Sequence, residues 1–304
     1  MLSRLYHFLD RRYTNKAYLY IYRLFKLMLN IIMPIIYCIS SRNPLNTQSE
    51  VIISFTSFPA RIKKVHLVVE SLLRQTVMPR EIVLYLSEKQ FSSYDVLPFQ
   101  LKKLEKQGFL RIRLVPEDFK PHKKYYYAVT EYSDSDIITV DDDLLYPEDF
   151  VEGLINAHAK YVEAICCNHA SKIISNANTV LPYKQWQTEG VEMDIPRFDL
   201  LPIGCGGVYY PRHSFNNNIL LRQELFMELC PLADDLWLKC NTLLCERKTV
   251  RSSQYNNFVF VDILIRHNMR LCDSNVSHNR NDAQMCNILK AFPQIIDILE
   301  RPNE

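Results

Sequence analysis

Three consecutive aspartates, residues 141–143, directly follow an apolar, β-branched run at 136–140 (DIITV). Side chains spaced by two point the same way at the end of an extended strand, so Asp141 and Asp143 can converge while Asp142 faces elsewhere. Hard divalent ions such as Mn²⁺ or Mg²⁺ prefer oxygen ligands and share them with substrate phosphates. The pattern therefore favours metal-assisted binding of a diphosphate. The alternative is a solvated turn in which Asp142 or Asp143 caps the next helix.

The elements that would position these aspartates alternate between strands and helices. Short apolar runs predict strands at 51–56, 81–87, 109–115 and 136–140, and helical spacing of apolar residues predicts helices at 62–75, 101–108 and 125–132. This alternation predicts an α/β fold with a mainly parallel central sheet flanked by helices. Ligands of such sheets bind beyond the carboxyl ends of the strands, which is where the aspartates lie.

The second half of the chain is less regular and contributes two further motifs. Residues 201–211 (LPIGCGGVYYP) contain three of the six glycines of the chain, so the backbone there is expected to bend tightly or to approach another group closely. Residues 231–246 predict a helix whose first turn contains Asp234 and Asp235. Acids in the first turn also stabilise a helix through its dipole, which is the structural alternative for this pair.

Five motifs occur in order over residues 51–282: IISFTSFPARI, SLLRQTVMPREIVLYLS, TVDDDLLYP, GCGGVYYP and ADDLWLK. Together they resemble the GT-A fold of nucleotide-sugar-dependent glycosyltransferases, family 2-like members in particular. A sixth element, FKPHKKYYYAV, resembles uncharacterised bacterial members linked to surface-polysaccharide synthesis. The resemblance implies a Rossmann-like sheet, an Asp-X-Asp metal site and a nucleoside-diphosphate-sugar donor.

The resemblance also implies roles for the acidic residues. Asp143 would be the first metal ligand, and Asp141 would contact the ribose or the metal. His278 lies where some family members place a further metal ligand, although a lone histidine is more often packed or exposed. Asp235 would be the general base that deprotonates the acceptor hydroxyl. Asp234 is its rival, because "ADD" departs from the usual Glu-Asp pair of the family.

The remaining candidates form a set expected at the nucleotide and donor. Thr56 and Arg61 follow the first strand and fit nucleotide contacts. Lys123 and Lys124 could balance the charge of the departing diphosphate, with an exposed charge pair as the alternative. The full donor-binding set is Thr56, Arg61, Lys123, Lys124, Asp141, Asp142, Gly206 and Gly207; within it, Asp142 is a turn or cap residue, and the two glycines approach the sugar or only form a turn.

These assignments predict an enzyme that transfers a sugar from a UDP- or GDP-linked donor to a hydroxyl of a glycan or lipid-linked acceptor, with Mn²⁺ or Mg²⁺ as cofactor. Inversion at the sugar carbon rests on the acidic motif alone, and a retaining enzyme is equally possible if that motif is structural. Two alternatives remain open. A nucleotidyltransferase would use a similar sheet and metal but usually has a glycine- and basic-rich loop after the first strand, where this chain has SFTSFPARIKK without a glycine. A non-catalytic nucleotide- or carbohydrate-binding protein would keep the site without turnover.

The N-terminal segment differs from the rest of the chain. Residues 1–50 hold seven basic and two acidic residues. The net charge of the whole chain is only +2, and this small charge argues against nucleic-acid binding. Residues 17–38 are apolar apart from a stripe that includes Arg23, Lys26 and Asn30. We expect residues 1–48 to be a basic amphipathic segment and linker that contacts a membrane peripherally, and residues 49–304 to be the glycosyltransferase domain.

Two alternatives to a peripheral membrane helix are a helix that packs on its own domain or a partner, and a helix that spans the membrane. The expected location is the inner face of the cell membrane. The nine cysteines show no zinc-binding spacing and are expected to be reduced, as in a cytoplasmic protein.

Overall fold

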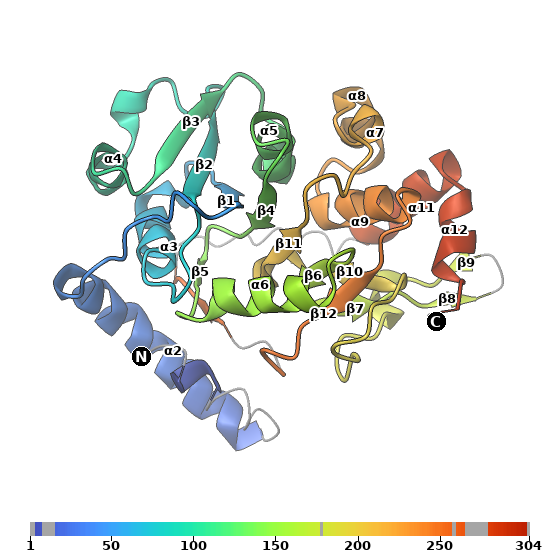
Figure 1. Cartoon of the computed structure of the whole chain (residues 1–304), viewed down its shortest axis with the longest axis horizontal. Helices are drawn as coiled ribbons and strands as arrows, with labels where there is room; N and C mark the ends of the chain where they lie inside the picture. Colours follow the sequence, from blue (N-terminus) through green and yellow to red (C-terminus); the bar gives the residue numbers. More distant parts are fainter. Residues whose placement is uncertain (1–3, 8–15, 177–178, 257–259, 265–278, 303–304) are drawn as a thin grey trace.

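The apolar runs at 51–56 and 81–87 form two adjacent inner strands of a seven-stranded sheet in the computed structural model of the chain (Figure 1). The structure describes residues 4–7, 16–176, 179–256, 260–264 and 279–302, with the side chains of 16–21 excepted. The helices are α2 (Lys16–Ile39), α3 (Val65–Leu72), α4 (Phe99–Lys106), α5 (Lys123–Glu131), α6 (Phe150–Lys160), α7 (Asn217–Leu220), α8 (Gln223–Leu229), α9 (Asp234–Leu244), α11 (Arg280–Ala291) and α12 (Gln294–Leu299), with short 3-10 turns η1 (Ile62–Lys64), η2 (Tyr94–Val96), η3 (Lys120–His122), η4 (Tyr183–Gln185) and η5 (Gly204–Gly206).

The strands of the main sheet lie in the order β12-β6-β11-β4-β1-β2-β3. Neighbouring strands are parallel except at β11, which runs antiparallel to both of its neighbours. The predicted α/β class, a mainly parallel sheet flanked by helices, is therefore confirmed. The strands are β1 (Val51–Thr56), β2 (Glu81–Ser87), β3 (Arg111–Val115), β4 (Asp136–Thr139), β5 (Leu144–Leu145), β6 (Ile165–Cys167), β7 (Ala170–Lys172), β8 (Ser175–Asn176), β9 (Thr179–Val180), β10 (Leu200–Pro202), β11 (Val208–Tyr210), β12 (Thr249–Arg251) and β13 (Val261–Asp262).

Both faces of the sheet are buried, which explains why its central strands are apolar throughout rather than alternating. Along β1, Ile53 and Phe55 point into a core that is shared with α2, α3, α4 and α6. Ile52 points to the opposite side, into a core shared with α5, α9, α11 and α12. The sheet is thus a rigid layer between two sets of helices, and the loops at the ends of its strands are held from both sides (Figure 1).

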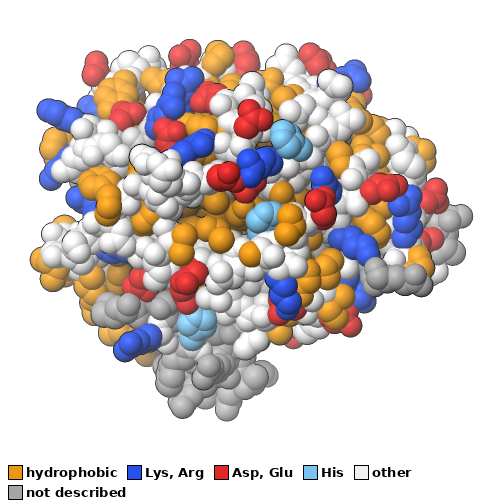
Figure 2. All heavy atoms as spheres, viewed as in Figure 1, with side chains coloured by type: hydrophobic (Ala, Val, Ile, Leu, Met, Phe, Trp, Pro, Cys, Tyr) orange, Lys and Arg blue, Asp and Glu red, His pale blue; other side chains and the backbone are white. Residues whose placement is uncertain are grey.

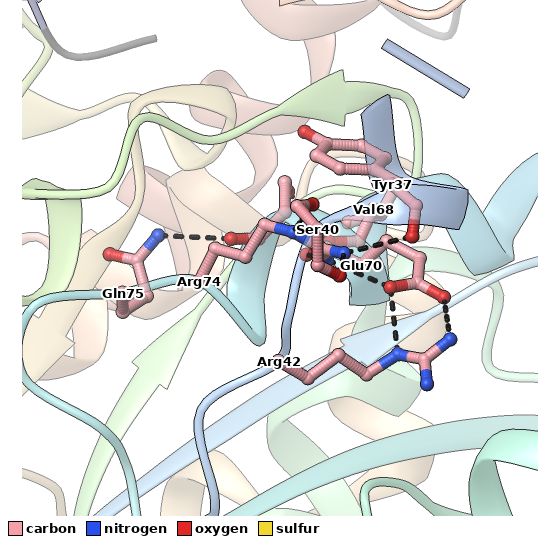
Figure 3. A network of polar contacts seen from close by, with 8 residues as sticks. Tyr37, Ser40, Arg42, Val68, Glu70, Arg74 and Gln75 are labelled. Carbon is pink, nitrogen blue, oxygen red and sulfur yellow. Dashed lines mark hydrogen bonds and ion pairs between the residues drawn. The ribbon is translucent and has the colours of Figure 1, made fainter. Parts of the chain in front are cut away.

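Helix α2 lies along the outside of the domain and is fastened to it at its C-terminal end by a polar network (Figures 1 and 3). Arg74, just after α3, donates to the backbone oxygens of Tyr37 and Ser40 at 2.9 Å each, so it satisfies carbonyls that a helix end leaves open. It also donates to Glu70 at 2.8 Å, and Arg42 binds the same carboxylate through two nitrogens at 2.9 and 2.7 Å. Although burial opposes ionisation of Glu70, the bonds from Arg42 and Arg74 lower its pKa below the ordinary value.

We expect Arg74→Met to lower the free energy of unfolding by about 2–4 kcal/mol, because it removes charged hydrogen bonds worth about 1.5–3 kcal/mol each and leaves helix carbonyls unpaired. Urea unfolding measures the change. Arg113→Met is a matched control, since Arg113 pairs with Glu131 at 3.0 Å near the surface and should cost less than about 1 kcal/mol. Equal losses in the two variants would contradict a structural role for the network.

Candidate functional site

The candidate site lies where two neighbouring parallel strands end. Strands β1 and β4 are paired with Ser54 opposite Thr139, so the loops that follow them leave the sheet at the same edge. The loop after β1 carries Ser57 and Arg61, and the loop after β4 carries the three aspartates. The N-terminus of α9 and the short turn η5 approach the same place. Residues that are far apart in the sequence therefore meet beyond the carboxyl edge of the sheet.

Asp142 joins the two loops. Its side chain is buried, and its carboxylate accepts hydrogen bonds from the Ser57 hydroxyl at 2.5 Å and from Arg61 Nη1 at 2.6 Å. Helix α6 begins after Asp149, so Asp142 does not cap it. Because its oxygens are engaged within the protein, Asp142 holds Arg61 and the loop after β1 in place, while its two neighbours remain partly accessible.

Asp143 shares its neighbouring cation, Arg61, with Asp142. Arg61 Nη1 lies 3.0 Å from its Oδ2, but the same nitrogen also serves Asp142. Burial raises the pKa of Asp143 to about 7, and the negative charge of Asp141 adds to this rise. The backbone oxygen of Asp143 accepts from Ile263 N at 2.7 Å, which ties the loop to the segment after β13. A carboxylate of this kind favours the approach of a cation.

Lys124 connects the strand end to helix α9. Its buried Nζ lies 3.0 Å from Asp141 Oδ1 and 2.8 Å from Asp234 Oδ2. Burial opposes the charge of Lys124, but the carboxylates of Asp141, Asp234 and Asp235 raise its pKa well above the ordinary value. A lysine that stays protonated in a buried position fixes the two acidic motifs relative to each other.

Asp235 sits against the backbone of η5. Its Oδ2 accepts from Gly204 N at 3.0 Å, and a Cβ on Gly204 would lie 2.8 Å from Asp235 Oδ1 and 3.0 Å from Lys124 Nζ. Glycine is thus required at 204 by this close approach. Asp235 is partly accessible, yet desolvation by the surrounding protein raises its pKa to about 7, with the charge of Asp234 adding and Lys124 opposing. That value suits a group that takes up a proton near neutral pH.

The other predicted residues have contacts of their own. The Thr56 hydroxyl donates to Tyr85 O at 2.8 Å, and the buried Lys123 pairs with Asp118 rather than with the three aspartates. Gly206 and Gly207 pack where side chains would collide: a Cβ would lie 2.6 Å from His169 Cβ and 2.3 Å from Phe150 Cζ, respectively. Gly207 also has a φ of +77°, which favours glycine. His278 lies outside the described residues.

The donor atoms of Asp141 and Asp143 fit a divalent metal ion. Both offer carboxylate oxygens, and both side chains are partly accessible at the end of the same strand. Within the described part of the chain, no group of three or more His, Cys, Asp or Glu side chains is arranged to hold a metal. The protein would therefore supply two carboxylates, and phosphate oxygens and water would complete the coordination, as is usual for Mg²⁺.

Three residues of this arrangement were not predicted from the sequence: Ser57, Gly204 and Asp262. Ser57 lies inside the motif after the first strand, and Gly204 lies beside the two glycines that were singled out. The charge of Asp262 contributes to the raised pKa of Asp143. The pattern GCGG carried a signal for Gly204, but only the position of Asp235 shows which glycine is approached.

The sequence matches no protein-family model, and no curated protein matches it. Among solved structures, a mannosyltransferase from Pyrobaculum calidifontis in complex with GDP-Man and Mn²⁺ is similar with a TM-score of 0.47 and 11% identity, over 90% of this chain and 75% of that one. UTP-bound UGPase from Acinetobacter baumannii is similar with a TM-score of 0.37 and 9% identity, over 67% of this chain and 85% of that one. A CMP:2-keto-3-deoxy-manno-octonic acid synthetase complexed with CTP is similar with a TM-score of 0.39 and 9% identity, over 66% of this chain and 87% of that one. These are distant likenesses among enzymes with nucleotide or nucleotide-sugar ligands, and the function proposed below rests on this chain's own residues.

Proposed function

We propose that this protein is a metal-dependent glycosyltransferase that moves a sugar from a nucleoside-diphosphate donor, UDP- or GDP-linked, to a hydroxyl of a glycan or lipid-linked acceptor. One observation carries the proposal. The Asp-X-Asp loop after β4 and the acidic start of α9 meet at a single buried lysine, with Nζ 3.0 Å from Asp141 and 2.8 Å from Asp234. A donor-binding acidic loop and a second acid with raised pKa beside it are the two components that such a transfer requires.

The donor side of the site consists of Asp141, Asp143 and two cations. Asp141 and Asp143 would hold Mn²⁺ or Mg²⁺, which would neutralise the diphosphate as it departs. Arg61 is held by Asp142, and Lys124 is held by Asp141 and Asp234, so both cations are positioned before substrate binds. Cations fixed in this way stabilise developing negative charge without having to reorganise.

The acceptor side is assigned to Asp235. One of its oxygens is held by Gly204 N, which orients the carboxylate, and its pKa of about 7 lets it accept the proton of an acceptor hydroxyl. Asp234 is engaged with Lys124, so it is the weaker candidate for the base. Attack by the deprotonated hydroxyl as the diphosphate leaves would invert the sugar carbon.

A nucleotidyltransferase is the second candidate, and the loop after β1 argues against it. Residues 57–61 contain no glycine, and the side chains of Ser57 and Arg61 both bond to Asp142. The backbone of that loop is thus fixed against the neighbouring strand end by side chains, in place of a glycine-rich loop open to a triphosphate. A binding protein without turnover is separated from an enzyme by measuring donor binding and sugar transfer in the unmodified protein and in Asp235→Asn.

We expect Asp143→Ala to abolish the metal-dependent part of nucleotide-sugar binding. Thermal unfolding of the purified protein with UDP-, GDP- and CMP-sugars, with and without Mn²⁺, measures this, because a donor at about a hundred times its Kd stabilises the fold by about 2.7 kcal/mol. Asp134→Ala is the matched control, since Asp134 is an exposed aspartate before the other end of β4. A Mn²⁺-dependent shift in Asp143→Ala as large as in the unmodified protein would overturn the metal assignment.

A further inference from the structure

Helix α2 has two different long faces. Toward the domain it presents Leu29, Met33 and Tyr37, which are buried, together with two polar side chains. Lys26 forms an ion pair with Asp262, and Asn30 donates to Asp262 O and accepts from Leu264 N, at 2.9 and 2.8 Å. Lys26 and Asn30 are therefore turned inward, against β13 and the residues that follow it.

The outward face of α2 carries exposed hydrophobic side chains from Leu24 to Ile39. Its exposed side chains repeat at intervals of one, three and four residues, so they form one continuous stripe. Leu24 is 70% exposed, Ile31 63% and Ile35 60%. Figure 2 shows hydrophobic side chains at the lower left edge of the molecule, where α2 lies in Figure 1. The full stripe is Leu24, Leu27, Met28, Ile31, Ile32, Ile35 and Ile39.

This arrangement reverses the usual distribution on an interfacial helix, in which a charged face points to water. Here the folded domain contacts Lys26 and Asn30, and the stripe that faces water is apolar. A stripe of this extent requires a covering partner. We propose that α2 docks this face on an anionic lipid bilayer, lying in the plane of the interface. The proposal goes beyond the proposed function, because docking needs neither donor nor acceptor.

Composition and charge favour a bilayer over a second protein. The stripe is made of Leu, Ile and Met, whereas the energetic centres of protein interfaces are enriched in Trp, Tyr and Arg. An exposed basic residue of the same helix borders it, because Arg23 lies beside Leu24. Basic residues beside an apolar stripe match the acyl chains and headgroups of an anionic membrane.

The contacts of the inner face favour lying on the membrane over crossing it. Tyr22–Ile39 is the helical stretch within the described residues that is long and apolar enough to span a bilayer. A spanning helix would lose the bonds that Lys26 and Asn30 make to the domain. It would also lose the bond that Arg74 of the domain makes to the C-terminal end of α2. It would also place Lys26 in hydrocarbon without its partner, at a cost of several kcal/mol. A docked helix keeps all of these contacts.

Sedimentation of the purified full chain with vesicles of phosphatidylcholine and phosphatidylglycerol tests the proposal. We expect the unmodified protein to bind, and Ile31→Glu/Ile35→Glu to lower partitioning at least about tenfold, since each substitution puts a charge in place of an exposed aliphatic side chain that docking would bury in the bilayer. Val162→Glu/Phe99→Glu is the matched control: these side chains are 58% and 72% exposed on other elements, and partitioning should change less than about twofold. Equal partitioning of the two double variants, or no binding of the unmodified protein, would overturn the proposal.

A label on Cys38 gives a second readout that does not depend on a substitution in the stripe. Cys38 is exposed near the end of α2, and Cys286 is exposed on α11. With Cys272 and Cys286 changed to serine, an environment-sensitive dye on Cys38 should shift to the blue on adding vesicles and be quenched by headgroup-level quenchers. The same dye on Cys286, with Cys38 and Cys272 changed to serine, should not respond. Quenching of the Cys38 dye from the far leaflet would indicate that the helix spans the bilayer. A dimer that forms without vesicles and is lost in Ile31→Glu/Ile35→Glu would assign the apolar face to a second copy of the chain. Either result would overturn the proposal.

Discussion

Asp235→Asn is expected to leave donor binding intact and to lower the rate of sugar transfer by about a thousandfold, within the range of about 10²–10⁴ that a general base contributes. Asparagine keeps the acceptor oxygen for Gly204 N but cannot take up a proton. Transfer is measured as nucleoside diphosphate released from the donor that stabilises the protein most, with a membrane lipid extract as the source of acceptor. Donor binding is followed by the thermal shift of the same sample.

Asp234→Asn is the control for this assignment, because Asp234 adjoins Asp235 and pairs with Lys124. It should retain most of the transfer activity. Loss of transfer in Asp234→Asn with activity kept in Asp235→Asn would exchange their roles. Unchanged transfer in Asp235→Asn would remove it from the mechanism, and bound donor without any turnover in the unmodified protein would support a binding protein.

The pH dependence of transfer provides a separate check. Burial raises the pKa of Asp235 to about 7, and the base is active only when it is ionised. The rate should therefore rise with pH through about 7 and level off above it. The same raised pKa means that the folded state binds the proton more tightly than the unfolded state, so ionisation of Asp235 lowers stability progressively between about pH 4 and pH 7, and the full cost is present above pH 7. Asp235→Asn should consequently be at least as stable as the unmodified protein at pH 8.

The fold could be predicted where local sequence determines it. The strands at 51–56 and 81–87 were predicted with the bounds that the structure has, because both are apolar on each face and end in polar residues. Helix α5 begins two residues before its predicted start, at Lys123, because η3 leads directly into it. Helix ends depend on such contacts with neighbouring turns, which apolar spacing does not report.

The partners of the site residues could not be predicted in the same way. Asp142 was expected to be a turn or cap residue, but its bonds go to Ser57 and Arg61, more than eighty residues earlier in the chain. The inward position of Lys26 likewise depends on Asp262, which lies 236 residues later. The spacing of polar residues shows which face of a helix is polar. It does not show which charged residue of the folded domain lies opposite that face.

The largest effect on stability is expected from Lys124→Met, which should lower the free energy of unfolding by about 3–5 kcal/mol. Lys124 is the buried cation between Asp141 and Asp234, and removing one member of a buried charge cluster leaves the others without compensation. Urea unfolding at pH 8 measures the loss. Lys123→Met is the matched control: Lys123 is equally buried, but it pairs with Asp118, which is 24% exposed and can regain water, whereas Lys124 also pairs with Asp234, which is 10% exposed; the cost should therefore be clearly smaller for Lys123→Met.

The double variant Lys124→Met/Asp234→Asn should recover part of the stability, because it removes one of the stranded charges. The loss in Lys124→Met should also shrink as the pH falls from 8 toward 5. Lys124 lowers the pKa of Asp235 in the unmodified protein, so without the lysine this pKa should rise further above its unfolded value, and the folded state gains protons and stability at lower pH. A pH-independent loss, or equal losses in the two lysine variants, would show that Lys124 acts through packing alone. The electrostatic link between the aspartate loop and α9 would then have to be abandoned.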